Sequence, residues 1–202
     1  MRQRPIARLF FGKILNADLA AMAGDEFWAS PEIAAVADDR YRSDLARLAA
    51  ATPRLLEQLA ELPMGMSHGD AAPDNLLDAG DGSVTAIDRS YASVAPVGSD
   101  LGQLLSGRVA DEDPSADEFR ARLEVAIRSF GEGFADEGGE FDRVAARQAC
   151  ITYLTVRFVF SALLLEPHHD VGDDATELLA RRAALGRVGL DLALELVDGP
   201  AT

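Results

Sequence analysis

Residues 67 to 101 constrain the fold of this chain most, because they interrupt a sequence whose apolar residues otherwise recur at helical spacing. Two short apolar segments, beginning at Leu76 and Val84, are separated by the turn-rich sequence DAGDG. Such an arrangement is typical of a β-hairpin. The sequence therefore predicts an α+β fold that is mainly α-helical, with a short hairpin between helical regions at 1–66 and 102–202.

Helix signals divide the two flanking regions into seven segments. Ser30-Pro31 and Thr52-Pro53 each place a good N-cap residue before a proline at the first helical position, which favours a helix start at both places. Pro63 would end the second of these helices. We therefore expect helices over residues 5–22, 31–50, 53–62, 100–108, 115–136, 141–165 and 174–197.

Length and composition indicate one compact domain. With 202 residues, 48% of them hydrophobic, the chain can bury a substantial core. The net charge of −15 makes nucleic acid and an anionic membrane surface poor partners, because phosphate binding relies on Lys and Arg. The single cysteine, Cys150, lies in an apolar run, so we expect a buried, inert thiol and a cytoplasmic protein.

The sequence His68-Gly69-Asp70, followed by Asn75 and then by Asp88 after the hairpin, carries the functional signal. Phosphoryl transfer needs a carboxylate that orients the attacking hydroxyl, and oxygen ligands for the metal ions that bridge the phosphates. The offset of five residues from Asp70 to Asn75 matches the protein-kinase catalytic loop H-R-D-L-x-x-x-N. The pattern predicts Asp70 as the base and Asn75 and Asp88 as Mg²⁺ ligands.

A chance loop is the alternative interpretation, because Asp, Gly and Asn are common in turns. His and Asn are rare in this chain, however, with three His and two Asn. At these frequencies the pattern H-G-D-x-x-x-x-N should arise by accident in only about one of several thousand such chains. We therefore interpret the stretch as a catalytic segment.

At these residues the sequence resembles the aminoglycoside phosphotransferase family, whose relatives include choline, homoserine and fructosamine kinases. The matching segments are the catalytic loop over residues 67–77, the strand end VTAID over 84–88, and PVGSDL over 96–101, which opens the next helix. One residue departs from the family pattern. Family members usually carry an aromatic residue after the metal-binding Asp, and this chain has Arg89 there. The resemblance is to the second lobe of the family's bilobal fold, a protein-kinase-like C-terminal lobe.

The resemblance assigns a role to each residue of the segment. It implies that Asp70 is the catalytic base, that Asn75 and Asp88 bind Mg²⁺, and that His68 and Asp100 brace the loop by hydrogen bonding. It also implies ATP as the phosphoryl donor and a small-molecule hydroxyl as the acceptor. An aminoglycoside is the default acceptor, and a cationic substrate would suit the acidic chain.

The nucleotide-binding half of such an enzyme is not recognisable in the sequence. There is no Walker A pattern, and the only lysine, Lys13, lies in a helical pattern instead of a Val-Ala-Ile-Lys strand. The glycine cluster at 131–139 misses G-x-G-x-x-G at Asp136. We therefore expect residues 1–202 to form a single C-terminal lobe without the N-terminal nucleotide lobe. On its own this chain is expected to bind ATP weakly or undetectably and to be an incomplete or inactive phosphotransferase. A non-catalytic binding module of kinase-like fold stays open as the alternative function.

Two further features are interpreted structurally. The sequence HHD at 168–170 could bind a metal, but adjacent loop residues rarely point at one ion, so a solvated loop is expected. The aromatic residues Tyr153, Phe158 and Phe160, with Trp28 elsewhere, are expected to pack in the core.

Overall fold

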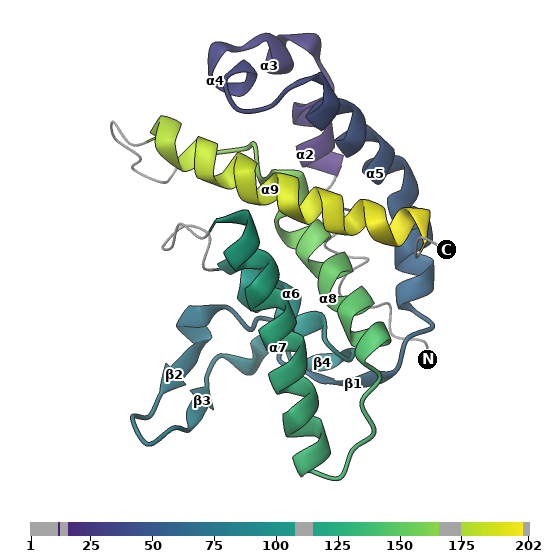
Figure 1. Ribbon diagram of the computed structural model, residues 1–202, viewed down its shortest axis with the longest axis vertical. Coiled ribbons are helices and arrows are strands. Elements are labelled where there is room, and N and C mark those ends of the chain that lie inside the picture. The colour runs from purple at the N-terminus through teal and green to yellow at the C-terminus, as the bar shows by residue number, and fades with distance from the viewer. Residues whose placement is uncertain (1–11, 13–15, 108–114, 166–174, 200–202) are drawn as a thin grey trace.

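The computed structural model describes residues 12, 16–107, 115–165 and 175–199 of the chain. Helices make up most of it, and two small sheets lie at one end, away from α3 and α4 (Figure 1). The α-helices are α2 (Asn16–Ala21), α3 (Asp25–Ala29), α4 (Pro31–Ala34), α5 (Asp39–Leu59), α6 (Ser99–Gly107), α7 (Ala116–Asp136), α8 (Arg143–Arg157) and α9 (Ala175–Asp198). The strands are β1 (Met64–Ser67), β2 (Leu76–Asp78), β3 (Val84–Ala86) and β4 (Ser93–Pro96). The predicted α+β, mainly helical fold class is confirmed.

The first half of the chain departs from the predicted helices. Ser30-Pro31 opens only the short α4, and the long helix α5 begins at Asp39. Its N-cap is Asp38, whose carboxylate accepts a hydrogen bond of 2.8 Å from the Tyr41 backbone N–H. The predicted helices over 31–50 and 53–62 are therefore wrong, since one helix spans most of both ranges.

The predicted break at Thr52-Pro53 is absent because Pro53 lies inside α5. A proline within a helix removes one backbone hydrogen bond and costs about 3 kcal/mol. The Thr52 hydroxyl donates to the Leu48 carbonyl at 2.7 Å. Leu48, Thr52 and Leu55 are fully buried on one face of the helix. Burial of that face offsets the lost bond, which a local N-cap signal does not register.

The second half follows the prediction more closely. Helices α6, α7 and α9 begin and end within about two residues of the expected bounds. A capping box formed by Ser115 and Glu118 starts α7. Helix α8 is shorter than the predicted 141–165, because the backbone leaves the helical region at Phe158 (φ −132°, ψ −51°). Phe158 and the next two residues, Val159 and Phe160, are all buried, so the chain stays in the core after the helix ends.

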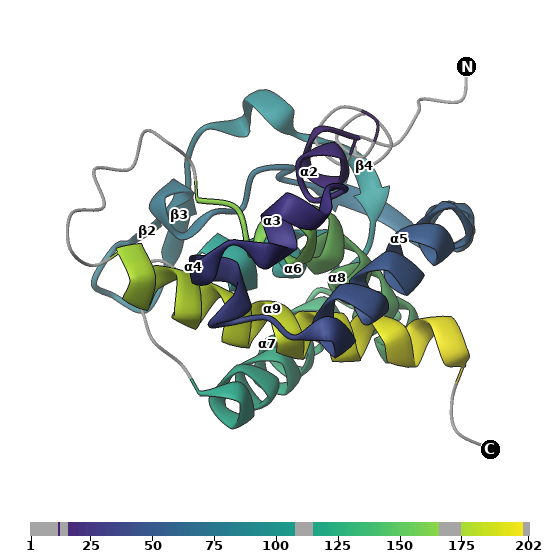
Figure 2. The ribbon, with the colours of Figure 1, turned by 90° about the horizontal axis from the view of Figure 1, so that it is seen from above.

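Helix α8 lies in the middle of the molecule and contacts α5, α6, α7 and α9 (Figures 1 and 2). Its Cys150 is fully buried, as predicted, and burial raises the pKa of the thiol to about 12. Gly102 of α6 lets the two helices approach closely, because an added Cβ would lie 2.5 Å from the Cys150 carbonyl oxygen. The close approach of α6 to α8 sets the distance between two helices that both contribute side chains to the candidate site.

Two antiparallel pairs of strands make up the sheets. The predicted hairpin is present as β2 and β3, with Leu76 opposite Ala86. The second pair, β1 with β4, places Ser67 opposite Ser93. The sequence did not indicate this pair, because the four residues of β1, MGMS, carry neither β-branched nor aromatic side chains.

Some predictions fall on residues that the structure does not describe. Only residues 16–21 of the predicted helix 5–22 are described as helix, and the HHD sequence at 168–170 lies outside the described residues. Phe158 and Phe160 are core residues, and the partly buried Tyr153 and Trp28 pack against the two buried clusters.

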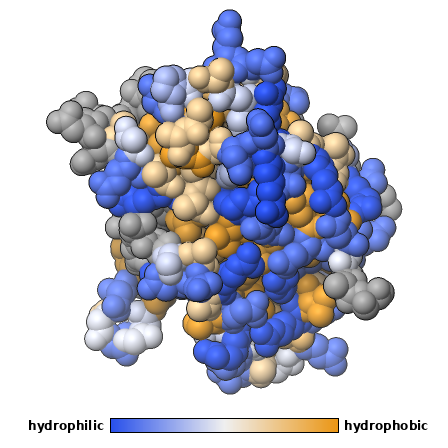
Figure 3. Space-filling model, turned by 45° about the horizontal axis from the view of Figure 1, so that its top comes forward, coloured by the Kyte–Doolittle hydropathy of each residue, from blue (hydrophilic) through white to orange (hydrophobic). Residues whose placement is uncertain are grey.

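The visible surface is mixed. Hydrophilic side chains cover much of the face in Figure 3, and apolar groups lie between them. Among the described helices, none combines the length and the apolar character needed to cross a membrane.

Candidate functional site

The loop from Ser67 to Asn75, called here the Asp70 loop, is held against the start of α6 by Asp100. One carboxylate oxygen of Asp100 accepts hydrogen bonds from the Ser67 hydroxyl at 2.7 Å and from the Gly69 N–H at 3.0 Å. Its other oxygen accepts from the His68 N–H at 2.8 Å. A charged acceptor with three donors fixes the backbone just before Asp70.

His68 ties the same loop to the segment that follows β3. Its Nε2 lies 2.7 Å from the Ile87 carbonyl oxygen, which can only accept, so Nε2 carries the proton. The other ring nitrogen, Nδ1, is buried and has no hydrogen-bond partner in the described structure. The contact places the Asp70 loop beside Ile87, the residue before Asp88.

Gly69 has a backbone conformation that explains why glycine stands at this position. Its φ is +76°, and an added Cβ would collide with the backbone carbonyl of Tyr91, coming within 2.8 Å of the carbonyl carbon. A side chain here would be disfavoured both by the backbone angle and by the lack of space.

The Asp70 carboxylate is surrounded by side chains from three elements. Nδ2 of Asn75 donates to Oδ2 of Asp70 at 3.1 Å and to the Asp70 carbonyl at 2.8 Å. Nε2 of Gln103, on α6, donates to Oδ1. The guanidinium of Arg157, in the last turn of α8, lies 3.5 Å from the same oxygen. Asp70 is therefore held in one orientation by groups far apart in the sequence.

Arg157 connects these partners to one another. It donates to Oε1 of Gln103 at 2.6 Å and to the Gly69 carbonyl at 3.4 Å. Burial lowers the pKa of the Arg157 guanidinium, and the nearby Asp70 carboxylate partly offsets that effect. The sequence analysis missed Arg157 and Gln103. One signal was available, since Arg157 is the only charged residue between Arg147 and Glu166, and a charge in an apolar run is rarely left unpaired.

Asn75 and Asp88, the expected metal ligands, are brought together by the hairpin. The Ile87 N–H donates to the Asn75 carbonyl at 2.9 Å, which extends the β2–β3 pairing by one residue pair. Asp88 follows directly, exposed and in the left-handed region with φ +51°. Hydrogen bonds from Ser90 lower the pKa of the Asp88 carboxyl, so it is ionised at neutral pH.

The donor set fits Mg²⁺ better than a soft or tightly caged metal. A carboxamide oxygen of Asn75 and a carboxylate of Asp88 are hard oxygen ligands that leave positions for water and phosphate. Within the described ranges, no three His, Cys, Asp or Glu side chains gather in a way that could hold a metal ion. Two oxygen ligands would leave most coordination positions of such an ion for water or other oxygen ligands.

Apolar side chains are exposed around the site. Nine large apolar side chains are exposed in the described part of the chain, and seven of them lie between residues 64 and 94. They are Met64, Met66, Leu77, Val84, Ile87, Tyr91 and Val94. Leu77 and Ile87 flank the two candidate metal ligands along the hairpin, so apolar surface adjoins the polar groups of the site.

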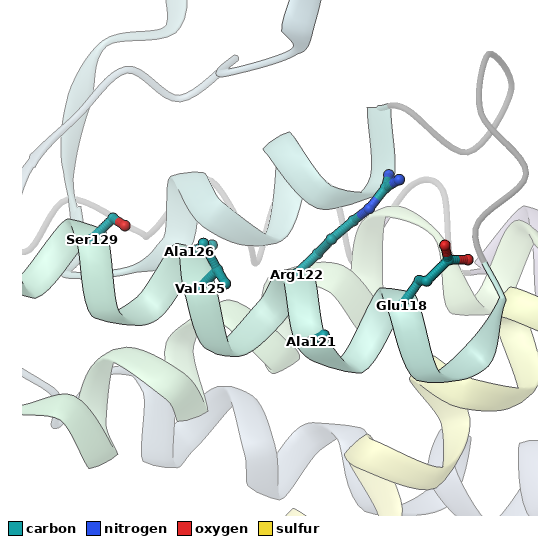
Figure 4. A pocket seen from close by; sticks show the side chains of 6 residues that line it. All are labelled: Glu118, Ala121, Arg122, Val125, Ala126 and Ser129. Carbon is teal, nitrogen blue, oxygen red and sulfur yellow. The ribbon is translucent and has the colours of Figure 1, made fainter.

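Two hollows lie away from the Asp70 loop. One, of about 440 Å³, follows a face of α7 that includes Glu118, Arg122 and Val125 (Figure 4). A larger one, of about 840 Å³, lies among α5, α8 and α9 and is lined by Arg143 and Glu195 among others. Neither is lined by Asp70 or by the candidate metal ligands.

The comparisons with known proteins agree with the motif. No curated protein and no solved structure matches this chain. The sequence model of the phosphotransferase enzyme family matches residues 14–137, which is more than half of the chain. That span contains the Asp70 loop, the hairpin and Asp100, whereas Arg157 lies beyond it. The chain therefore belongs to the phosphotransferase enzyme family.

Proposed function

We propose that the chain is the catalytic and acceptor-binding lobe of an ATP-dependent small-molecule O-phosphotransferase, with Asp70 as the base. One observation carries this proposal. The hairpin and the Asp70 loop gather a carboxylate, a carboxamide and a second carboxylate, from Asp70, Asn75 and Asp88, in a member of a phosphotransferase family. These are the groups that phosphoryl transfer requires.

In the proposed reaction, Asp70 orients an acceptor hydroxyl and takes its proton as the hydroxyl oxygen bonds to the γ-phosphorus. The bond from the γ-phosphorus to the leaving diphosphate oxygen breaks, and its electron pair leaves with the diphosphate. Asn75 and Asp88 would hold Mg²⁺, which when bound neutralises charge on the phosphates. The contacts of Asp100 and His68 keep the loop backbone in place during this step.

The exposed apolar residues suggest where the nucleotide base would lie. Leu77 and Ile87 are exposed next to the proposed metal ligands, and a planar base would bury their side chains. A base in this position would leave its phosphates near Asn75 and Asp88. In this arrangement the apolar side chains would contact the base, and the polar groups would lie near the phosphates.

The acceptor is proposed to be a cationic small molecule of the aminoglycoside kind, as in antibiotic resistance. The net charge of −15 attracts polycations and disfavours nucleic acid and anionic membranes as partners. We place the enzyme in the cytoplasm, where ATP is available.

A second candidate function is a non-catalytic ligand- or partner-binding module. It is favoured by a specific feature: the described residues include no lysine that could contact nucleotide phosphates. In that case the apolar side chains around the two sheets would contact a ligand or partner directly. A pure binding module, however, would have no physical need for Asp70, Asn75 and Asp88 together.

The test is phosphate transfer by the purified chain with ATP, Mg²⁺ and a panel of aminoglycosides and small primary alcohols, followed as ADP release. Asp70→Ala should abolish turnover, whereas Asp74→Ala should not, because Asp74 is an exposed neighbour in the same loop. Turnover near the parent rate in Asp70→Ala would reject the base assignment. No ATP binding and no transfer by this chain alone would be compatible both with a lobe that needs a separate nucleotide-binding half and with the binding module.

A further inference from the structure

Arg157 and Gln103 contact one oxygen of the Asp70 carboxylate, and Asn75 contacts the other. We propose that Arg157 and Gln103 are positioning residues, which occupy Oδ1 of Asp70 so that Oδ2 is the atom that receives the acceptor's proton. The inference rests on the proposed function and deepens it, because it names two residues and one atom of the same site. One of the two residues, Arg157, lies outside the span 14–137 that the family model matches.

The two oxygens of the Asp70 carboxylate differ in how many groups they contact. Each oxygen of an ionised carboxylate can accept about two hydrogen bonds. Oδ1 of Asp70 accepts a hydrogen bond from Nε2 of Gln103 and forms an ion pair with the guanidinium of Arg157 at 3.5 Å, so two groups already occupy this oxygen. Oδ2 faces Nδ2 of Asn75 at 3.1 Å. One site on Oδ2 is then left for the acceptor hydroxyl.

Arg157 fixes the orientation of the Gln103 amide. A carboxamide can present either its NH₂ group or its oxygen to a neighbour. Arg157 has only donors, and it contacts Oε1 of Gln103 at 2.6 Å, so the amide must direct its NH₂ group away from the guanidinium and toward Asp70. Without Arg157, the amide could turn and place its oxygen against the carboxylate. Arg157 therefore acts on Asp70 both directly and through Gln103.

Gln103 and Arg157 are both carried by helices, which are more rigid than the loop that carries Asp70. Asp70 lies on a loop, but Gln103 lies on α6 and Arg157 in the last turn of α8. Gln103 is 8% exposed, and the Arg157 side chain is 22% exposed. The close packing of α6 on α8 at Gly102 fixes the distance between the two helices. Groups on packed helices position a reacting side chain more reliably than loop contacts alone.

The alternative is that Arg157 only stabilises the fold by pairing with a nearby carboxylate. A structural role predicts a loss of stability with little change in the turnover of the molecules that remain folded. A positioning role predicts a fall in kcat at unchanged KM. The two explanations therefore differ in a measurable way.

The experiment compares Arg157→Met and Gln103→Leu with the control Arg147→Met, using ATP, Mg²⁺ and the best acceptor of the panel. Arg147 is on the same helix and is partly buried, but it pairs with Glu124 and Glu195, away from the Asp70 loop. We expect kcat to fall about 100-fold in the first two variants, as for other misplaced catalytic groups, with both KM values unchanged. The double variant should be no slower than Arg157→Met, because the two residues act as one unit.

A second readout does not depend on turnover. The side-chain NH₂ signals of Gln103, assigned by their absence in Gln103→Leu, should move in Arg157→Met and in Asp70→Asn but not in Arg147→Met. If these signals do not move, the contacts are absent and the inference is overturned, whatever the activity. Should Arg157→Met fail to fold, as judged by circular dichroism, Gln103→Leu carries the kinetic comparison.

The outcomes separate the inference from the proposed function. A parent chain that turns over, with Arg157→Met and Gln103→Leu near the parent kcat, would overturn the positioning role and leave the function standing. If the parent chain shows no turnover on any acceptor, the Gln103 signals decide the inference, because the contacts of Arg157 and Gln103 with Asp70 do not depend on ATP binding. A fall in kcat equal to that of Arg147→Met would mean a general structural effect and would also overturn the inference.

Discussion

Asp70 and Asp88 are two carboxylates of one candidate site, but the chain holds them in different ways. Asp70 contacts Asn75 of its own loop, Gln103 of α6 and Arg157 of α8. Asp88 is exposed, and within the described part of the chain its carboxylate accepts hydrogen bonds from Ser90, two residues further along. The position of the first depends on tertiary packing, whereas that of the second depends on a local turn.

This difference fits the two proposed roles. A base must meet one proton of a bound hydroxyl, so its orientation has to be fixed before the substrate arrives. A ligand of a shared Mg²⁺ ion is oriented further by the ion and the phosphates when they bind. Substitutions around Asp70 should therefore reduce both stability and turnover. Substitutions around Asp88 should change one of these quantities with little effect on the other.

The largest effect on folding is expected from Gly69→Ala, in the packed region. Gly69 has φ +76°, and a new Cβ would collide with the Tyr91 backbone. We expect a loss of about 3 kcal/mol in the free energy of unfolding, measured with urea, and a loss of turnover.

Gly80→Ala is the matched control. Its φ of +79° is nearly the same, but it lies in the hairpin turn with nothing within 4 Å of an added Cβ. The control should cost only about 1 kcal/mol, from the backbone angle alone. Equal losses in the two variants would show that the packing against Tyr91 does not matter.

The contrast between local contacts and contacts distant in sequence also explains how much of the structure the sequence could predict. Local signals were sufficient for the β2–β3 hairpin, with its DAGDG turn, and for the start of α7 at the Ser115 capping box. Spacing in the sequence also made Asp70, Asn75 and Asp88 the candidate site residues, and the structure places Asn75 in contact with Asp70. In each case the residues that define the feature are close together in the chain.

Features that depend on distant contacts were missed or mispredicted. Pro53 does not end a helix, because burial of one face of α5 outweighs the local signal. Helix α8 ends at Arg157 although the apolar sequence continues, and the residues after it are buried in the core. The contact of Arg157 with Gln103 joins residues 54 positions apart, and no spacing rule in the sequence connects them.

A smaller effect on folding is expected from Asp88→Asn, in the exposed region. Asparagine tolerates the left-handed backbone of this position, and the side chain is exposed. The midpoint of urea unfolding should therefore stay near that of the parent, while Mg²⁺-dependent turnover is lost with the carboxylate. Asp78→Asn, an exposed change in the same hairpin, should affect neither quantity. Substantial unfolding in Asp88→Asn would show that Asp88 is held by more than its local turn.

The smallest effect is expected from Ser90→Ala, which removes the main hydrogen bond to the Asp88 carboxylate. The pKa of Asp88 lies below its ordinary 3.8, chiefly because the Ser90 hydroxyl donates to it, so Ser90→Ala should raise that pKa toward 3.8. The depressed pKa contributes stability that is present above about pH 4 and is lost as the pH falls through the folded value. The variant should therefore differ from the parent in stability above pH 4 and converge with it in stronger acid, as measured by urea unfolding across pH.

Ser83→Ala supplies the matched comparison for that titration, because Ser83 makes the same two contacts with Asp81 in the hairpin turn. It should raise the pKa of Asp81 and leave that of Asp88 unchanged, as followed by NMR of the side-chain carboxyl carbons. If instead each serine variant moved both carboxyls, the two turns would be coupled through the hairpin. The local character of the Asp88 region would then be refuted, and its contrast with the packed surroundings of Asp70 would disappear.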